Sequence, residues 1–190
     1  MGLRVKTGRA IAVLLSGPAD APRVLARREI SLVDPAHPET RQPYHAALGL
    51  EGAAAEAVVA GARCAVERVA ARELAALAEE LRGLAASACP CGALVVSSDA
   101  DPARIANPHV RAHAGEGRLF REALETALRA QGLAPRVFLA RALPERAARA
   151  LGRGDRELAR EVAALGAALG PPWRGEEKAA ALAAWTLLAG

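Results

Sequence analysis

The sequence is poor in aromatic residues and cysteine, and it has no long apolar segment. Aromatic side chains make up 3% of its 190 residues, which removes most of the stacking surface that single-stranded nucleic acids use. Three cysteines, an odd number, without a secretory leader argue against a disulfide framework. No apolar run is long enough to cross a bilayer, and the residues after Met1 lack the apolar core of a signal peptide. We therefore expect a cytoplasmic protein without a membrane-spanning segment.

Lysine is also scarce, so the positive charge of the chain comes almost entirely from arginine. Lys6 and Lys178 are the only lysines, and the formal net charge is +4. Such a small excess is compatible with nucleic-acid binding but does not by itself indicate it.

The first 33 residues predict three antiparallel strands, at 3–6, 10–16 and 22–33. A glycine in the first short link supplies the positive φ that a tight hairpin needs. The second strand is apolar on both faces, which is typical of an internal strand covered by helices on both sides. Charged residues at 27–29 interrupt the third strand, as in an edge strand.

The rest of the chain alternates between helical and extended patterns, and its 52% apolar content is enough for one buried core. Gly115 and Gly117 weaken the third helical segment, so a fresh start near Glu116 stays open. Taken together, the pattern predicts a single α/β domain over 1–190, in which helices flank a mixed five-stranded sheet in three layers. The predicted elements are a loop at 34–50, helix 52–86, strand 93–98, helix 107–131, strand 136–140, and helices 144–151, 155–169 and 176–188.

This order of elements resembles the ribonuclease H-like superfamily, most closely the RuvC-type Holliday-junction resolvases. In that family the first strand ends Ile-Asp-Pro-Gly, and Val5-Lys6-Thr7-Gly8 stands at that place here. The family's fourth strand ends in a catalytic Glu, where this chain has Ser97 and Ser98. The family's last helix carries two acids, which correspond to Glu177 and Ala180 here.

The resemblance implies a scaffold that has lost most of its metal-binding carboxylates. Two-metal phosphodiester cleavage requires several carboxylates around Mg²⁺ ions that lie about 4 Å apart. An ammonium at Lys6 would repel a divalent cation, and Glu177 is the only acid that keeps its register. We predict that Lys6 lies at the centre of the sheet and forms an ion pair with Glu177 where the family would hold metal.

Three functions are compatible with this resemblance. The favoured hypothesis is a non-catalytic protein of ribonuclease H-like fold that acts by binding, without a cofactor; a homodimer is compatible with the sequence. The first alternative is a divergent Mg²⁺-dependent nuclease whose candidate catalytic residues are Asp99, Asp101, Glu176 and Glu177. The second is a nucleotide-binding actin-like relative, which is disfavoured because that group needs two such domains.

His109 and His113 lie four residues apart, with Glu116 three residues further on. This spacing is found among zinc ligands. The metalloprotease form, however, needs a Glu directly after the first His, and Val110 stands there. We therefore interpret the two histidines as partly exposed residues near the mouth of a cleft and expect no metal site.

The arginines allow either a phosphate-contacting surface or an ordinary solvated face. Glu122 and Glu125 lie between arginines of the helix at 107–131, which favours the solvated face over nucleic-acid contact. The arginines concerned are Arg4, Arg9, Arg23, Arg27, Arg104, Arg111, Arg118, Arg121 and Arg129. Candidates for contact with a ligand in the cleft are Lys6, Arg9, Ser97, Ser98, His109, Arg111, His113 and Arg118.

Overall fold

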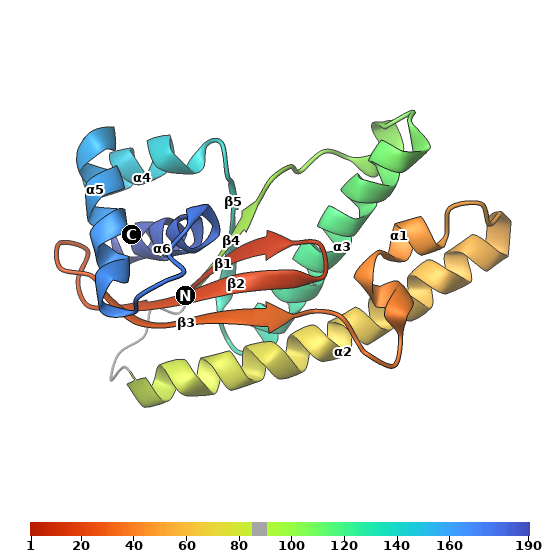
Figure 1. The fold of residues 1–190 in the computed structure, drawn as a ribbon, viewed down its shortest axis with the longest axis horizontal. Helices are drawn as coiled ribbons and strands as arrows, with labels where there is room; N and C mark the ends of the chain where they lie inside the picture. Colours follow the sequence, from red (N-terminus) through yellow and green to blue (C-terminus); the bar gives the residue numbers. More distant parts are fainter. Residues whose placement is uncertain (85–90) are drawn as a thin grey trace.

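The computed structural model describes residues 1–84 and 91–190, in which five strands form one mixed sheet in the order β3-β2-β1-β4-β5 (Figure 1). Strands β1 (Gly2–Lys6), β2 (Arg9–Ser16) and β3 (Arg23–Ser31) are antiparallel. Strand β4 (Cys91–Val96) runs parallel to β1, and β5 (Ala134–Leu139) runs parallel to β4. The predicted mixed sheet with three antiparallel strands at its start is therefore confirmed.

Helices cover both faces of the sheet, which makes the fold a three-layer α/β structure. Side chains of β1, β2 and β4 that point to one face pack against α2 and α3, whereas Val13, Leu15, Ala93 and Val95 point to the other face, which α4, α5 and α6 cover. Figure 1 shows the last three helices gathered on one side of the sheet. The helices are η1 (Pro38–Arg41), α1 (Pro43–Ala46), α2 (Gly52–Leu84), η2 (Pro102–Arg104), α3 (Pro108–Ala130), α4 (Leu143–Leu151), α5 (Asp155–Leu165), η3 (Gly166–Ala168) and α6 (Gly175–Leu188).

The hairpin strands occupy the positions that their side-chain patterns predict. Strand β2 is internal, and its residues 10–15 are all buried. Strand β3 lies at the edge, where Arg28 and Glu29 are exposed. Gly8 has a φ of +72° in the β1–β2 turn, as a tight hairpin turn requires.

Several predicted boundaries are wrong. The strand predicted at 93–98 ends at Val96, so Ser97 and Ser98 lie beyond it. The helix predicted over 155–169 ends at Leu165 and is followed by a 3₁₀ turn. The end of the helix predicted over 52–86 lies partly outside the described residues, and the structure places helix to Leu84. None of the helices within residues 1–84 and 91–190 has the length and apolar character needed to span a bilayer.

Two local features of the 34–50 segment and of α3 matter for the site. The segment predicted as a loop contains η1 and α1, and α1 packs against α3. Helix α3 runs unbroken through Gly115 and Gly117, so no new helix starts near Glu116. A Cβ at Gly115 would lie 2.9 Å from the ring of Tyr44, whereas a Cβ at Gly117 would meet nothing within 4 Å. Gly115 therefore allows α1 to approach α3 closely.

This difference predicts opposite effects for two Gly→Ala substitutions in the same helix. Gly117→Ala should raise the free energy of unfolding by up to about 1 kcal/mol, because alanine is the better helix former. Gly115→Ala gains the same propensity but forces a methyl group against Tyr44, and overpacking of this kind costs about 1–3 kcal/mol. Urea unfolding of both variants measures the difference. Equal stabilisation by the two substitutions would show that Tyr44 of α1 does not pack tightly against α3 at Gly115.

Candidate functional site

A cleft of about 390 Å³ opens where β1 and β4 end. Because the two strands are parallel neighbours, their carboxyl ends meet at one edge of the sheet, where α/β proteins commonly bind ligands. The turn after β1 and the residues after β4 supply its polar wall, and α3 closes the opposite side. Four of the residues predicted to line a cleft are brought together here: Lys6, Ser97, Ser98 and His113.

Glu176 of α6 lies between two cations beside this cleft. Its Oε1 is 3.5 Å from Nζ of Lys6, and its Oε2 accepts a hydrogen bond of 2.8 Å from Nη2 of Arg9. Burial alone would raise the pKa of Glu176, but the hydrogen bond and charge of Arg9, together with Lys6, outweigh it and lower the pKa. Glu176 is therefore held as a carboxylate, and its charge is neutralised by the two side chains from the hairpin.

The prediction that Lys6 pairs with Glu177 is wrong by one residue. Glu177 is buried, and its Oε2 accepts a hydrogen bond of 2.8 Å from the backbone N–H of Arg174. It thereby forms part of the capping box at the start of α6. Successive side chains on a helix point about 100° apart, because a turn holds 3.6 residues. Only Glu176 is directed at the hairpin.

Arg4 also reaches the edge of the sheet at this end. It donates to the carbonyl of Val95 at 3.1 Å and to Oγ of Ser97 at 2.8 Å. Burial lowers the pKa of Arg4, while the negative charge of Glu176 acts in the opposite direction. The hydroxyl of Ser97 is thus already engaged by a cation of the neighbouring strand.

The candidate acids of the nuclease hypothesis do not form one cluster. Asp101 caps η2 through a hydrogen bond of 3.1 Å from the N–H of Ala103, and it lies 3.8 Å from Nη1 of Arg118. Asp99 lines a cavity of about 220 Å³ that adjoins the cleft, together with Asp101, Arg118 and Arg121. In residues 1–84 and 91–190, the only group of three or more potential ligand residues close enough to share a metal ion consists of histidines.

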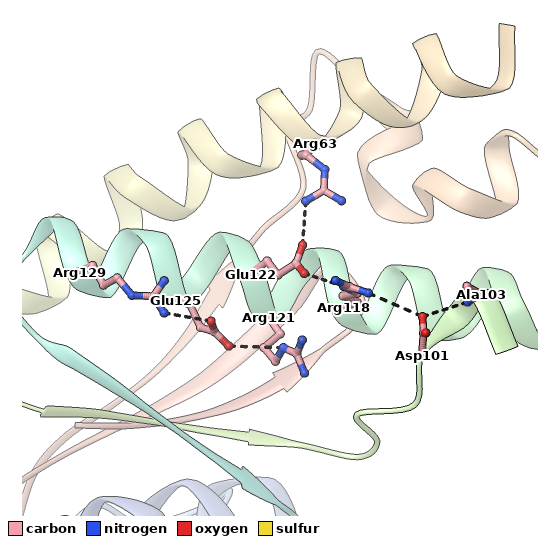
Figure 2. A network of polar contacts seen from close by, with 8 residues as sticks. All are labelled: Arg63, Asp101, Ala103, Arg118, Arg121, Glu122, Glu125 and Arg129. Carbon is pink, nitrogen blue, oxygen red and sulfur yellow. Dashed lines mark hydrogen bonds and ion pairs between the residues drawn. The ribbon is translucent and has the colours of Figure 1, made fainter. Parts of the chain in front are cut away.

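Acidic residues pair with most of the arginines predicted on α3 (Figure 2). Glu122 accepts hydrogen bonds from Arg118 at 2.7 Å and from Arg63 of α2 at 3.0 Å. Burial would raise the pKa of Glu122, but these two bonds and charges lower it. Glu125 bridges Arg121 and Arg129, at 3.4 and 3.3 Å. Arg104 lies in η2 rather than in the helix, and Arg111 is exposed on the first turns of α3.

Three imidazoles meet where α1 packs against α3. Nε2 of His45 lies 3.2 Å from Nδ1 of His109, and Nε2 of His109 lies 3.2 Å from Nε2 of His113. The sequence spacing pairs His109 with His113 but does not point to His45, which stands 64 residues before His109. The same spacing includes Glu116 as a possible ligand, whereas Glu116 is buried beneath the rings. No local pattern in the sequence relates His45 to α3, since the contact depends on how the 34–50 segment docks.

The comparisons with known proteins bear on the fold. No protein-family model matches the chain, and no curated protein matches it either. A structure of RuvC from Thermus thermophilus matches with a TM-score of 0.51 and 14% sequence identity. The match covers 97% of this chain and 90% of that one. The chain therefore has a ribonuclease H-like fold of the RuvC type.

Proposed function

We propose that residues 1–190 form a single ribonuclease H-like domain that acts by binding a ligand rather than by two-metal phosphodiester cleavage. The observation that carries this proposal is the position of Glu176 between Lys6 and Arg9 at the end of the central strand. Cations thus stand where the resemblance to resolvases would put the carboxylates that hold Mg²⁺.

The electrostatics of this edge disfavour a divalent cation. Mg²⁺ is bound in proteins by carboxylates and other oxygen ligands. Here the carboxylate of Glu176 is shared by an ammonium and a guanidinium, and a third cation, Arg4, lies within the influence of the same charge. A metal ion at this place would be repelled by the positive charges of Lys6 and Arg9, and it would have to displace both side chains from Glu176.

The lining of the cleft supports a ligand that carries acceptor atoms. Thr7 and Ser98 supply hydroxyl groups, Ser97 supplies a third that already accepts from Arg4, and Lys6, whose ammonium pairs with Glu176, also lines the cleft. The apolar lining residues include Val5, Val96, Ile105 and Val110. Ammonium groups only donate hydrogen bonds, and hydroxyls both donate and accept. We infer that the cleft receives a polar, acceptor-rich group.

The divergent nuclease remains the alternative function. It would use Asp99 or Asp101 with Glu176 and Glu177, and it would need Mg²⁺. The separation of these acids among Arg118, Arg9 and the cap of α6 counts against it. A nucleotide-binding actin-like relative is further disfavoured, since Lys6-Thr7-Gly8 replaces the Asp-x-Gly phosphate-binding turn of that group.

The proposal predicts that Mg²⁺ and Mn²⁺ neither support DNA cleavage nor change the stability of the fold. A four-way DNA junction should not be cleaved in either ion. The melting temperature should also stay constant, whereas an ion present at 100 times its Kd would stabilise the fold by about 2.7 kcal/mol. Lys6→Asp, which restores an acid at the end of β1, is the matched variant in which Mg²⁺ should raise the melting temperature. Cleavage by the wild type that disappears in Glu176→Gln would establish the nuclease instead.

The lowered pKa of Glu176 predicts a pH-dependent contribution to stability. Since the folded state holds this pKa below the unfolded value of about 4.3, the ion pairs stabilise the fold above that pH. Their contribution disappears as the pH falls through the lower, folded-state pKa. Glu176→Gln should therefore be less stable than the wild type at pH 7, and the gap should close under acid conditions. Urea unfolding at several pH values measures it, with the exposed Glu56→Gln as control; a gap that is independent of pH would contradict the pairing.

The RuvC-like fold suggests nucleic acid as a partner, but the paired arginines of α3 disfavour nucleic-acid binding. We expect no micromolar binding of a duplex or a four-way junction at about 50 mM salt in fluorescence anisotropy. Arg118→Ala should lower stability by releasing Glu122, whereas Arg111→Ala should change neither stability nor binding. Micromolar binding that falls steeply between about 50 and 200 mM salt, and that weakens in Arg111→Ala, would instead show contacts with phosphates.

A further inference from the structure

We propose that His45, His109 and His113 form a binding site for a divalent transition-metal ion of the zinc class. This site is separate from the position beside Lys6 and Glu176, and it does not depend on the function proposed for the cleft. It uses imidazole nitrogens from two elements, α1 and α3, and it lies at the mouth of the cleft, which His113 also lines.

The three histidines are close enough to share one tetrahedral ion once the His109 ring turns. One ligand nitrogen from each histidine lies within 4.8 Å of the other two, and the two closest pairs are both 3.2 Å apart. Zn–N bonds of about 2.0–2.1 Å in a tetrahedral site place neighbouring nitrogens about 3.3 Å apart. His109 faces its two neighbours with different ring nitrogens, so its exposed ring has only to turn to offer one of them to a shared ion.

Glu116 orients the histidines in the way that metal sites require. Its side chain is fully buried, at 0% exposure, and its Oε1 lies 2.7 Å from Nδ1 of His45. A carboxylate that accepts the Nδ1 proton leaves the lone pair of Nε2 directed at the other two rings. The same oxygen also accepts the backbone N–H of His45 at 3.3 Å. The tautomer and the position of His45 are thus set by a single buried carboxylate.

The second oxygen of Glu116 is an independent indication of a ligand. Oε2 is buried without a hydrogen-bond partner, although Nδ1 of His113 lies 3.7 Å away. A buried carboxylate oxygen without a partner is costly. If Nε2 of His113 bound an ion, Nδ1 would carry its proton toward Glu116, and a small movement would complete the bond. One carboxylate would then support two ligating histidines.

The donor set selects the class of metal. Imidazole suits Zn²⁺, Cu²⁺ and Ni²⁺, whereas Mg²⁺ and Ca²⁺ prefer oxygen ligands. Three protein ligands leave a fourth position for water or for an anionic group of a ligand. His109 and His113 stand one helical turn apart on the same face of α3, so the pair is presented together.

The test is a titration of the metal-free chain with Zn²⁺ by calorimetry and with Co²⁺ by visible absorption. We expect one ion per chain, with Co²⁺ bands in the visible region and without the near-ultraviolet band that thiolate ligands add. Glu116→Gln should weaken binding by about 10–100-fold, the usual effect of removing a group that orients a ligand. His113→Ala should weaken it further, and because its side chain is half exposed the fold should survive.

His37→Ala is the matched control, because His37 is exposed and pairs with Glu39 rather than with the other histidines. It should leave Zn²⁺ affinity unchanged. Absence of Zn²⁺ binding, a thiolate band with Co²⁺, or an equal loss in His37→Ala and His113→Ala would each overturn the proposed site. These outcomes differ from failure of the cleft proposal, which depends on Mg²⁺, Lys6 and Glu176 and leaves the histidines untouched.

Discussion

The close packing of α6 against β1 is the contact that brings Glu176 to the end of the central strand. Gly2 lies directly against the backbone of α6 at Ala180 and Ala184, where a side chain would force the helix away. The residues of α6 that face the sheet are short as well, with buried alanines at positions 180, 181, 183 and 184. Because the helix can lie this close, its first turn reaches the carboxyl end of β1. Glu176 is thereby placed between Lys6 and Arg9, and the same turn uses Glu177 to cap the helix.

Several acids beside the cleft and along α3 are matched by more than one cation. Glu176 contacts Lys6 and Arg9, and Glu122 is held by guanidinium groups from two helices. Side chains in such networks satisfy one another and present little net field to solvent. Many of the basic residues behind the net charge of +4 are thus paired within the fold, and the net charge alone does not indicate a surface that is available to a partner.

The features that depend on local pattern could be predicted from the sequence, whereas those that depend on docking could not. The two apolar faces of β2 predict an internal strand, and the charged residues of β3 predict an edge strand. The order of elements predicts the three layers. The partner of Lys6 was missed by one position, since an ion pair across 170 residues depends on the rotation of α6 about its axis. Helix α1 and the role of Gly115 were missed because both depend on the contact between Tyr44 and α3.

Docking of the 34–50 segment and assembly of the histidine cluster are a single event. Tyr44 fills the space that Gly115 leaves open, and the next residue, His45, then satisfies Glu116 through both its ring and its backbone N–H. A carboxylate with no exposed surface could not stay buried on α3 without these two donors. Glu116 thus ties α1 to α3, and α1 in turn completes the set of imidazoles. At the end of β1 Lys6 pairs with Glu176, whereas the group of potential metal ligands found in residues 1–84 and 91–190 consists of imidazoles that this docking brings together.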